Sequence, residues 1–410
     1  MNRDFHRYWS AEVTSTFGSA FTGTAIGVVG VTVFAASAAQ LGVVTAAASL
    51  PACLFGVFAG VLGDRLRRPR RALIVCDALA GLVVTGVAVG IWTGIADIWW
   101  LAALCFLLGC VVVLVETVYF THLRGLVPAD DLTKGRARLQ AGEYGASTAG
   151  QAVAGVLIAA VGGAVAFLVD AVSYLASLLL LSGITAPDEG ARADAEQTSG
   201  WRELGAGFVE AARHPFLRRF GGFVLLRSFG VGALTAITAP FLLREVHLPL
   251  GLYGVLFAIT GLAGLAGSVV AGRLCDRLGL RRTAVVGSVG TVLTGAALPL
   301  ADGPLPVAAG LALLGLGVPV LFGAIANIGL SGAITECVPE SVLGRVIAGL
   351  RTIGTAAQVV GALAGGLLGS AFGLRPAVWL CVAVSLAGGL FMLRVAATGA
   401  AAEPEPAPVG

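Results

Sequence analysis

The sequence predicts an all-α integral membrane protein with twelve transmembrane helices in two pseudo-symmetric six-helix bundles. Of its 410 residues, 57% are hydrophobic and only 12% are charged, about half the roughly 25% of a soluble domain. The mean hydropathy is +0.92. The 59 glycines and abundant alanines favour closely packed helices over a β-barrel, whose strands would alternate apolar and polar residues.

Twelve apolar stretches are each long enough for a helix that crosses a hydrocarbon core, which takes about 20 residues. They lie at 13–35, 41–63, 72–94, 98–119, 141–162, 165–185, 220–243, 251–275, 283–301, 306–330, 345–371 and 374–396. The first stretch is much longer than a signal-peptide core and lacks a cleavage pattern, so we expect it to be retained.

Arginine placement predicts the orientation, because short cytoplasmic loops are enriched in basic residues. With both termini in the cytoplasm, the outer connections carry only Arg244 and Arg375. A single lysine among many arginines, with abundant Ala and Gly, indicates a high-GC bacterial genome, so we expect a bacterial plasma-membrane protein. The expected segments are an N-terminal bundle (1–185), a cytoplasmic linker with a surface helix (186–219), a C-terminal bundle (220–396) and a disordered cytoplasmic tail (397–410).

The two halves of the chain repeat one another. Residues 59–66 read AGVLGDRL and residues 271–278 read AGRLCDRL, identical at six of eight positions. Such a duplication of six spans is the layout of a parallel-repeat transporter, whose substrate site lies between the halves.

The repeated segment resembles the signature loop of the major facilitator superfamily, which occurs once in each half. The matching residues are Gly60, Asp64, Arg65 and Arg68, then Gly272, Asp276 and Arg277. Arg67 stands where the first copy usually has glycine. Shorter segments, including the opening FHRYWSAEVTSTFGSAF and LVDAVSYLAS, resemble the drug:proton antiporter branch that includes macrolide and siderophore exporters.

The resemblance implies a conformational latch at the signature loop. A carboxylate at the cytoplasmic end of a helix, followed by arginines, can pair with the other half in one state and separate in the other. Asp64 and Arg68 would then stabilise the outward-facing state. The alternative is that these arginines only enforce topology.

Charged residues within spans are functional candidates because they are costly in a membrane. Glu116 resembles the acidic partner of the signature-loop arginines, which predicts a buried relay with Arg68 or Arg65; its rival role is proton carrier. Arg351 is expected to pair with Asp64 or Glu116 across the halves.

The first, fourth, seventh and tenth spans line the central cavity in this family, which makes Glu12, Arg227 and Asn327 substrate-cavity candidates. Glu12 lies near enough to the headgroups to be merely interfacial, whereas Arg227 could neutralise a cavity carboxylate or receive an acidic substrate. We expect structural hydrogen bonds from Asp77 and Asp170, and a proton-linked role stays open for Asp170.

The fifth stretch carries Gly145, Gly150 and Gly155 at a spacing that permits close helix packing. Gln151 stands where many exporters of the superfamily have proline, so the direction of transport is less well specified than the fold.

No phosphate-binding loop, metal-ligand cluster or catalytic set emerges from the sequence. We therefore expect no enzyme activity, no cofactor and no nucleic-acid partner, and a monomer driven by an ion gradient. The predicted function is export of an amphipathic small molecule, a drug or secondary metabolite, by proton antiport and alternating access. The alternative is an importer or facilitator of a small metabolite.

Overall fold

The computed structural model describes residues 3–64, 68–128, 131–186, 188, 215–337 and 340–399, which form helices and connections with no β-strand. The first half contains α1 (Arg3–Thr32), α2 (Ala38–Asp64), α3 (Pro69–Thr93), α4 (Ile98–Leu126), α5 (Leu132–Val161) and α6 (Gly163–Ser182). The second half contains α8 (Pro215–Pro240), η2 (Phe241–Glu245), α9 (Leu250–Leu278), α10 (Leu280–Gly295), η3 (Leu298–Leu300), α11 (Leu305–Cys337), α12 (Glu340–Phe372) and α13 (Leu374–Gly399). Each α-helix overlaps one predicted stretch, which confirms the twelve-helix, all-α class.

Ten helices in the described part of the chain are long and apolar enough to cross a membrane. The exceptions are α1, whose serines and threonines lower its hydropathy, and α13, for which only the segment Leu374–Gly389 enters this comparison. The C-terminal bundle begins earlier than expected, since α8 starts at Pro215, and α13 continues to Gly399. The expected surface helix of the linker and the tail from residue 400 lie outside the described residues.

The second half repeats the packing of the first. Helix α1 packs on α5 and α6, as α8 packs on α12 and α13. The pairs α2–α4 and α3–α6 recur as α9–α11 and α10–α13. Between the halves, the main contacts join α2 to α12 and α5 to α9.

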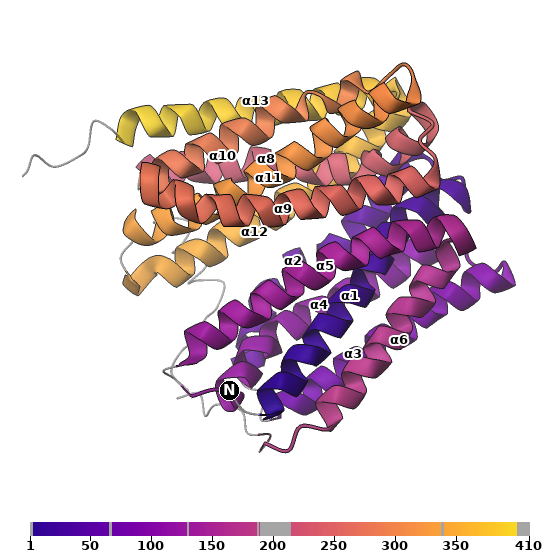
Figure 1. Cartoon of the computed structure of the whole chain (residues 1–410), viewed down its shortest axis with the longest axis vertical. Helices are drawn as coiled ribbons and strands as arrows, with labels where there is room; N and C mark the ends of the chain where they lie inside the picture. The colour runs from indigo at the N-terminus through magenta and orange to yellow at the C-terminus, as the bar shows by residue number, and fades with distance from the viewer. Residues whose placement is uncertain are drawn as a thin grey trace, which may run out of the picture.

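The two halves meet at one end and diverge at the other, where the N-terminus lies (Figure 1). At the meeting end, buried apolar side chains of both halves form one cluster that includes Phe21, Ile237 and Val378. At the other end each half has a separate cluster, around Phe5 in the first half and around Phe223 in the second. We call the first the closed end and the second the open end.

The turn between α9 and α10 explains one glycine of the signature loop. Gly279 has a φ of 79°, in the left-handed region that favours glycine. It lets α10 begin one residue after α9 ends, so the second copy of the loop is a sharp reversal at the open end. The matching position of the first copy, Arg67, lies outside the described residues.

Candidate functional site

Glycines bring the backbones of the two halves into direct contact at the closed end. A Cβ on Gly155 of α5 would lie 1.8 Å from the Cα of Gly254 on α9. A Cβ on Gly42 of α2 would lie 2.6 Å from the carbonyl oxygen of Ala362 on α12. Of the three predicted packing glycines, Gly155 therefore contacts the other half. Gly150 packs on α1, and the position of Gly145 is open.

Hydrogen bonds to the backbone also join the halves at this end. The Arg244 guanidinium, from η2, donates to the carbonyl oxygens of Ala36 at 2.7 Å and Val31 at 3.0 Å. The Ala39 amide donates to the Ser370 hydroxyl at 2.8 Å. Val31 lies in the last turn of α1, where helix carbonyls attract a cation, and Ala36 lies in the connection that follows the helix. We call these contacts, with the glycine contacts, the closed-end seam.

One ion pair joins the halves near the open end, and among the described residues it is the only one between them. Arg351 of α12 donates to the carboxylate of Glu116 on α4, which is one of the two partners expected for Arg351. The two side chains are 66% and 51% exposed. Glu116 is thus exposed rather than buried, because the halves diverge at this end.

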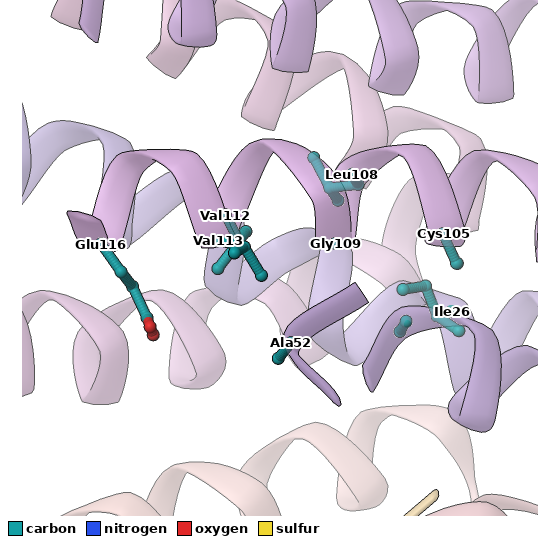
Figure 2. A pocket seen from close by; sticks show the side chains of 9 residues that line it. Ile26, Ala52, Cys105, Leu108, Gly109, Val112, Val113 and Glu116 are labelled. Carbon is teal, nitrogen blue, oxygen red and sulfur yellow. The ribbon is translucent and has the colours of Figure 1, made fainter. Parts of the chain in front are cut away.

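A pocket of about 160 Å³ lies beside this pair, between α1, α2 and α4. Among the described residues that line it, Glu116 supplies the only charged side chain and stands at one edge (Figure 2). The remaining lining is apolar: Ile26, Ala48, Ala52, Cys105, Leu108, Gly109, Val112 and Val113. Since these α4 residues flank the middle of the helix, the pocket lies about midway through the bundle. The arrangement can hold an apolar body with a polar group at the edge.

Arg227 and Asn327 lie on facing helices of the second half, α8 and α11. A Cβ on Gly323, one turn from Asn327, would lie 3.5 Å from the Arg227 guanidinium. Arg227 is partly buried, and no ion pair joins it to another described residue. The Asn327 side chain is exposed. Within the part of the chain that the structure describes, Arg227 thus has no cavity carboxylate to neutralise in this conformation.

Asp170 fastens α6 to α1. It is fully buried, accepts a hydrogen bond from Thr22 at 2.5 Å and a second from Ser173 at 3.2 Å. Gly18 of α1 leaves room for this contact, since a Cβ there would overlap Ser173. The geometry agrees with the structural role expected for Asp170.

The signature-loop residues make no ion pair with the other half among the described residues. The loop's Asp64 ends α2, and nothing is described of its side chain or of the surroundings of Gly60; Arg65 lies outside the described residues. Arg68 is exposed, as are Asp276 and Arg277 at the end of α9, and Gly272 has open space beside it. The latch therefore stays a prediction.

Neighbouring residues fix the first loop to its own half. Asp188 accepts hydrogen bonds from the backbone amides of Arg70 at 2.8 Å and Arg71 at 3.2 Å, which caps α3. The Arg70 side chain donates to the carbonyl oxygen of Ile184, just after α6. The arginines of this loop thus have partners besides a latch.

Asp4 holds the beginning of α1 to the chain after α6. Its carboxylate accepts hydrogen bonds from the Thr185 amide and hydroxyl and from the Ala186 amide at 2.9 Å. Burial acts to raise the pKa of Asp4, but these hydrogen bonds and the charge of Arg7 outweigh it and hold that pKa below its ordinary value.

Sequence reasoning missed Glu143 and Arg244. Glu143 lies on α5 and accepts a hydrogen bond from the Tyr119 hydroxyl. The only indication in the sequence was that Glu143 lies inside the predicted stretch at 141–162. Arg244 was noticed only as a rare basic residue in an outer connection, and that rarity was its signal.

Twelve apolar helices in two repeated halves, with a pocket among the helices of the first half, are typical of a multi-pass membrane transporter. The family model of the Major Facilitator Superfamily matches residues 8–333 and, in a second match, residues 223–409. The chain therefore belongs to the Major Facilitator Superfamily, whose members are transporters rather than enzymes. No curated protein sequence matches.

Solved structures show the same fold at low sequence identity. The nucleoside transporter NupG is 11% identical, with a TM-score of 0.78 over 96% of this chain and 99% of that chain. A bacterial homologue of the human lysosomal transporter Spinster, inward-facing and occupied, is 16% identical, with a TM-score of 0.77 over 99% and 100%. A bacterial homologue of the iron transporter ferroportin, inward-facing, is 16% identical, with a TM-score of 0.73 over 96% and 98%.

Proposed function

We propose that this transporter exports an amphipathic small molecule, a drug or secondary metabolite, across the bacterial plasma membrane in exchange for protons. The observation that carries the proposal is the pocket midway along α4, apolar except for the Glu116 carboxylate at its edge. An apolar wall with one charged group suits a hydrophobic body that bears a polar or cationic group. A sugar would need more hydrogen-bonding side chains than this pocket offers.

The transport cycle follows from the fact that one end of the protein is open and the other is closed. With both termini in the cytoplasm, the open end faces the cytoplasm and the conformation is inward-facing. Substrate then enters the pocket from inside, and the outward-facing state forms when the closed-end seam separates and the signature loops approach the other half. In that state Asp64 and Arg68 act as the latch.

The substrate and the opposite half compete for binding to the Glu116 carboxylate. Arg351 neutralises its carboxylate in the inward-facing state. A cationic group of the substrate, or a proton, can take the place of Arg351, and either exchange releases the contact between the halves. A proton that moves inward down the membrane potential releases about 2.3 kcal/mol per 100 mV, and this free energy can drive uphill export.

The test is proton release from acidified inside-out vesicles that contain the protein, with macrolides, lipophilic cations and siderophore-like acids added in turn. Export by antiport predicts proton release on addition of a transported compound. The Glu116→Gln variant should lose this response. Asp131→Asn is the matched control, because Asp131 pairs with Lys134 at the surface, remote from the pocket.

The outcomes separate the alternatives. Release that the Asp131→Asn variant keeps and the Glu116→Gln variant loses supports antiport through this pocket. Release in both variants would show that Glu116 is not required. No release with any compound, from protein shown to be folded and inserted, would favour the importer or facilitator of a small metabolite.

One observation favours that second candidate. Arg227 is partly buried on α8 without an acidic partner among the described residues. A buried guanidinium gains stability from a negative charge, so Arg227 suits a substrate with a carboxylate or phosphate group. Uptake of labelled anionic metabolites into cells, lost in Arg227→Gln and kept in Asp131→Asn, would support this reading.

A further inference from the structure

The Arg227 side chain reaches from α8 to the place where α10 and α11 pack together. A Cβ on Gly323 of α11 would lie 3.5 Å from Arg227 Nη2 and 3.9 Å from the Thr291 hydroxyl of α10. Among the described residues, no other atom of a neighbouring helix lies within 4 Å of that position. The guanidinium therefore borders a small open space on the α11 side.

Helix packing does not require a glycine at position 323. Elsewhere along α10 and α11, a Cβ on Gly287 would lie 2.3 Å from the Ala326 nitrogen, and a Cβ on Gly329 would lie 2.6 Å from the Ala284 nitrogen. The two backbones touch at those positions. At Gly323 the distances are ordinary van der Waals contacts. The missing side chain thus leaves room beside the guanidinium that the packing of the helices does not use.

The second half offers Arg227 no carboxylate at this depth. The sequences of α8, α10 and α13 contain no acidic residue, and the acidic residue of α11, Glu336, is about 20 Å farther along that helix. In the first half, Glu116 pairs with Arg351, and Glu12 is half-buried on α1. Within the described part of the chain, no carboxylate pairs with Arg227. A charge among membrane helices is normally paired, so a ligand of opposite charge is indicated.

Two further polar side chains lie one helical turn from this space. Ser288 of α10 is only 2% exposed, and its hydroxyl has no hydrogen-bond partner in the part of the chain that the structure describes. Asn327 of α11 is exposed. The residues before them, Gly287 and Ala326, are in contact, which puts Ser288 and Asn327 at the same level of the bundle. A buried hydroxyl without a partner is costly, and it also indicates a missing ligand.

The ligand chemistry that fits these groups is a compact oxyanion. A guanidinium binds a carboxylate or phosphate group through two parallel hydrogen bonds, and serine and asparagine can each donate one more. The Thr291 hydroxyl already donates to the Gly287 carbonyl oxygen at 2.9 Å, so it only borders the space. A water molecule could satisfy Ser288, but it would leave the charge of Arg227 unbalanced.

We propose that Arg227, Ser288 and Asn327 form a binding site for a compact oxyanion, a carboxylate or phosphate group, in the space that Gly323 leaves open. The site lies in the second half and is separate from the pocket beside Glu116. Its place in transport rests on the second candidate function, in which the acidic group belongs to the substrate. Binding of a free anion requires neither that function nor proton antiport.

Binding of labelled inorganic phosphate to the purified protein in phosphatidylcholine nanodiscs tests the proposal. In a scintillation proximity assay, the wild type should show saturable binding that unlabelled phosphate and acetate both displace. Arg227→Gln should weaken binding by about 10- to 150-fold, the range expected when hydrogen bonds to a charged group are lost. Gly323→Ala should also weaken it, because the methyl group occupies the space without a clash between the helices.

Gly310→Ala on the same helix is the matched control, because a Cβ at Gly310 meets nothing within 4 Å. Its affinity for phosphate should equal that of the wild type. Absence of saturable binding to the wild type, or equal binding to the wild type, Arg227→Gln and Gly323→Ala, would overturn the proposal. Should Arg227→Gln fail to fold, Gly323→Ala decides by the same criterion, since it adds only ordinary contacts.

Nanodiscs that also contain phosphatidylglycerol identify the source of the oxyanion. If this lipid displaces labelled phosphate from the wild type, a lipid headgroup supplies the anion in the membrane. If it does not, the site takes a soluble anion. Either result supports the site. Because the assay uses no gradient and no transported compound, failure here is distinguishable from failure of proton release or of metabolite uptake.

Discussion

A methyl group added to Gly155 should hold the closed end apart. Gly155 and Gly254 touch through their backbones, and the Cβ of Gly155→Ala would lie 1.8 Å from the Gly254 Cα, 2.7 Å from its carbonyl carbon and 3.0 Å from its nitrogen. All three atoms belong to the backbone of α9, so no side-chain rotation relieves the overlap. Relief requires α5 and α9 to separate, which opens the closed-end seam.

The size of the effect follows from the contact distance. Carbon atoms in van der Waals contact lie about 3.5–4.0 Å apart, so the helices must separate by about 2 Å. Overpacking of this kind costs about 1–3 kcal/mol. That cost falls only on conformations with the closed end shut, and it shifts the equilibrium toward conformations with that end open by about 5- to 150-fold.

Distance measurement between spin labels at the closed end tests this shift. Val33, just after α1, and Phe372, at the end of α12, are both well exposed and lie on opposite halves, so labels there report their separation. The labels would be placed in a chain whose native cysteines are replaced. Pulsed electron paramagnetic resonance should find a single short distance between the two labels in the parent chain. In Gly155→Ala it should find a second population with a longer distance.

Gly145→Ala on the same helix is the matched control. A Cβ at Gly145 meets nothing within 4 Å, so this variant gains the same helix propensity, about 1 kcal/mol, without the clash. If Gly155→Ala and Gly145→Ala give the same distance distribution, direct contact of the two backbones does not keep the closed end shut.

Three further predictions concern the two ends. Asp64→Asn should leave the protein inserted but strongly lower transport in the vesicle assay; near-wild-type turnover would refute the latch. Arg244→Gln should weaken the hydrogen bonds to the carbonyl oxygens of Val31 and Ala36 and populate the longer distance between labels at Val33 and Phe372. An unchanged distance distribution would exclude a role for Arg244 in closure. Asp4→Asn should lower the melting temperature at neutral pH, and the deficit should vanish on acidification, because stability from a carboxyl whose pKa is lowered is lost as pH falls through that pKa.

The helices could be predicted from the sequence because each span is specified locally. About 20 apolar residues suffice to mark a crossing, and charged or glycine-containing connections separate one crossing from the next. The same reasoning explains why one helix boundary differs from the predicted stretch at 220–243. Helix α8 begins at Pro215, inside a polar segment, because a helix can extend beyond the apolar residues that cross the membrane.

Partners across the halves could not be predicted in this way. Arg351 had two possible partners, Asp64 and Glu116, and only the relative position of the halves puts it on Glu116. Glu143 stands near the beginning of its predicted stretch, where a charge is ordinary. The packing of α5 against α1 and α4 is what places it beside Tyr119 and within range of Glu12.

The two ends differ in chemistry, and the difference suggests where transport is controlled. The closed-end seam consists of glycine backbones and of an arginine and a hydroxyl bound to backbone groups. Near the open end, the halves are joined by Glu116, whose carboxylate can accept Arg351, a proton or a cationic ligand. Since a ligand shifts a conformational equilibrium only by binding the two states differently, the proposed antiport predicts that protons and substrate act through the contacts near the open end. The closed-end seam then sets the baseline of that equilibrium.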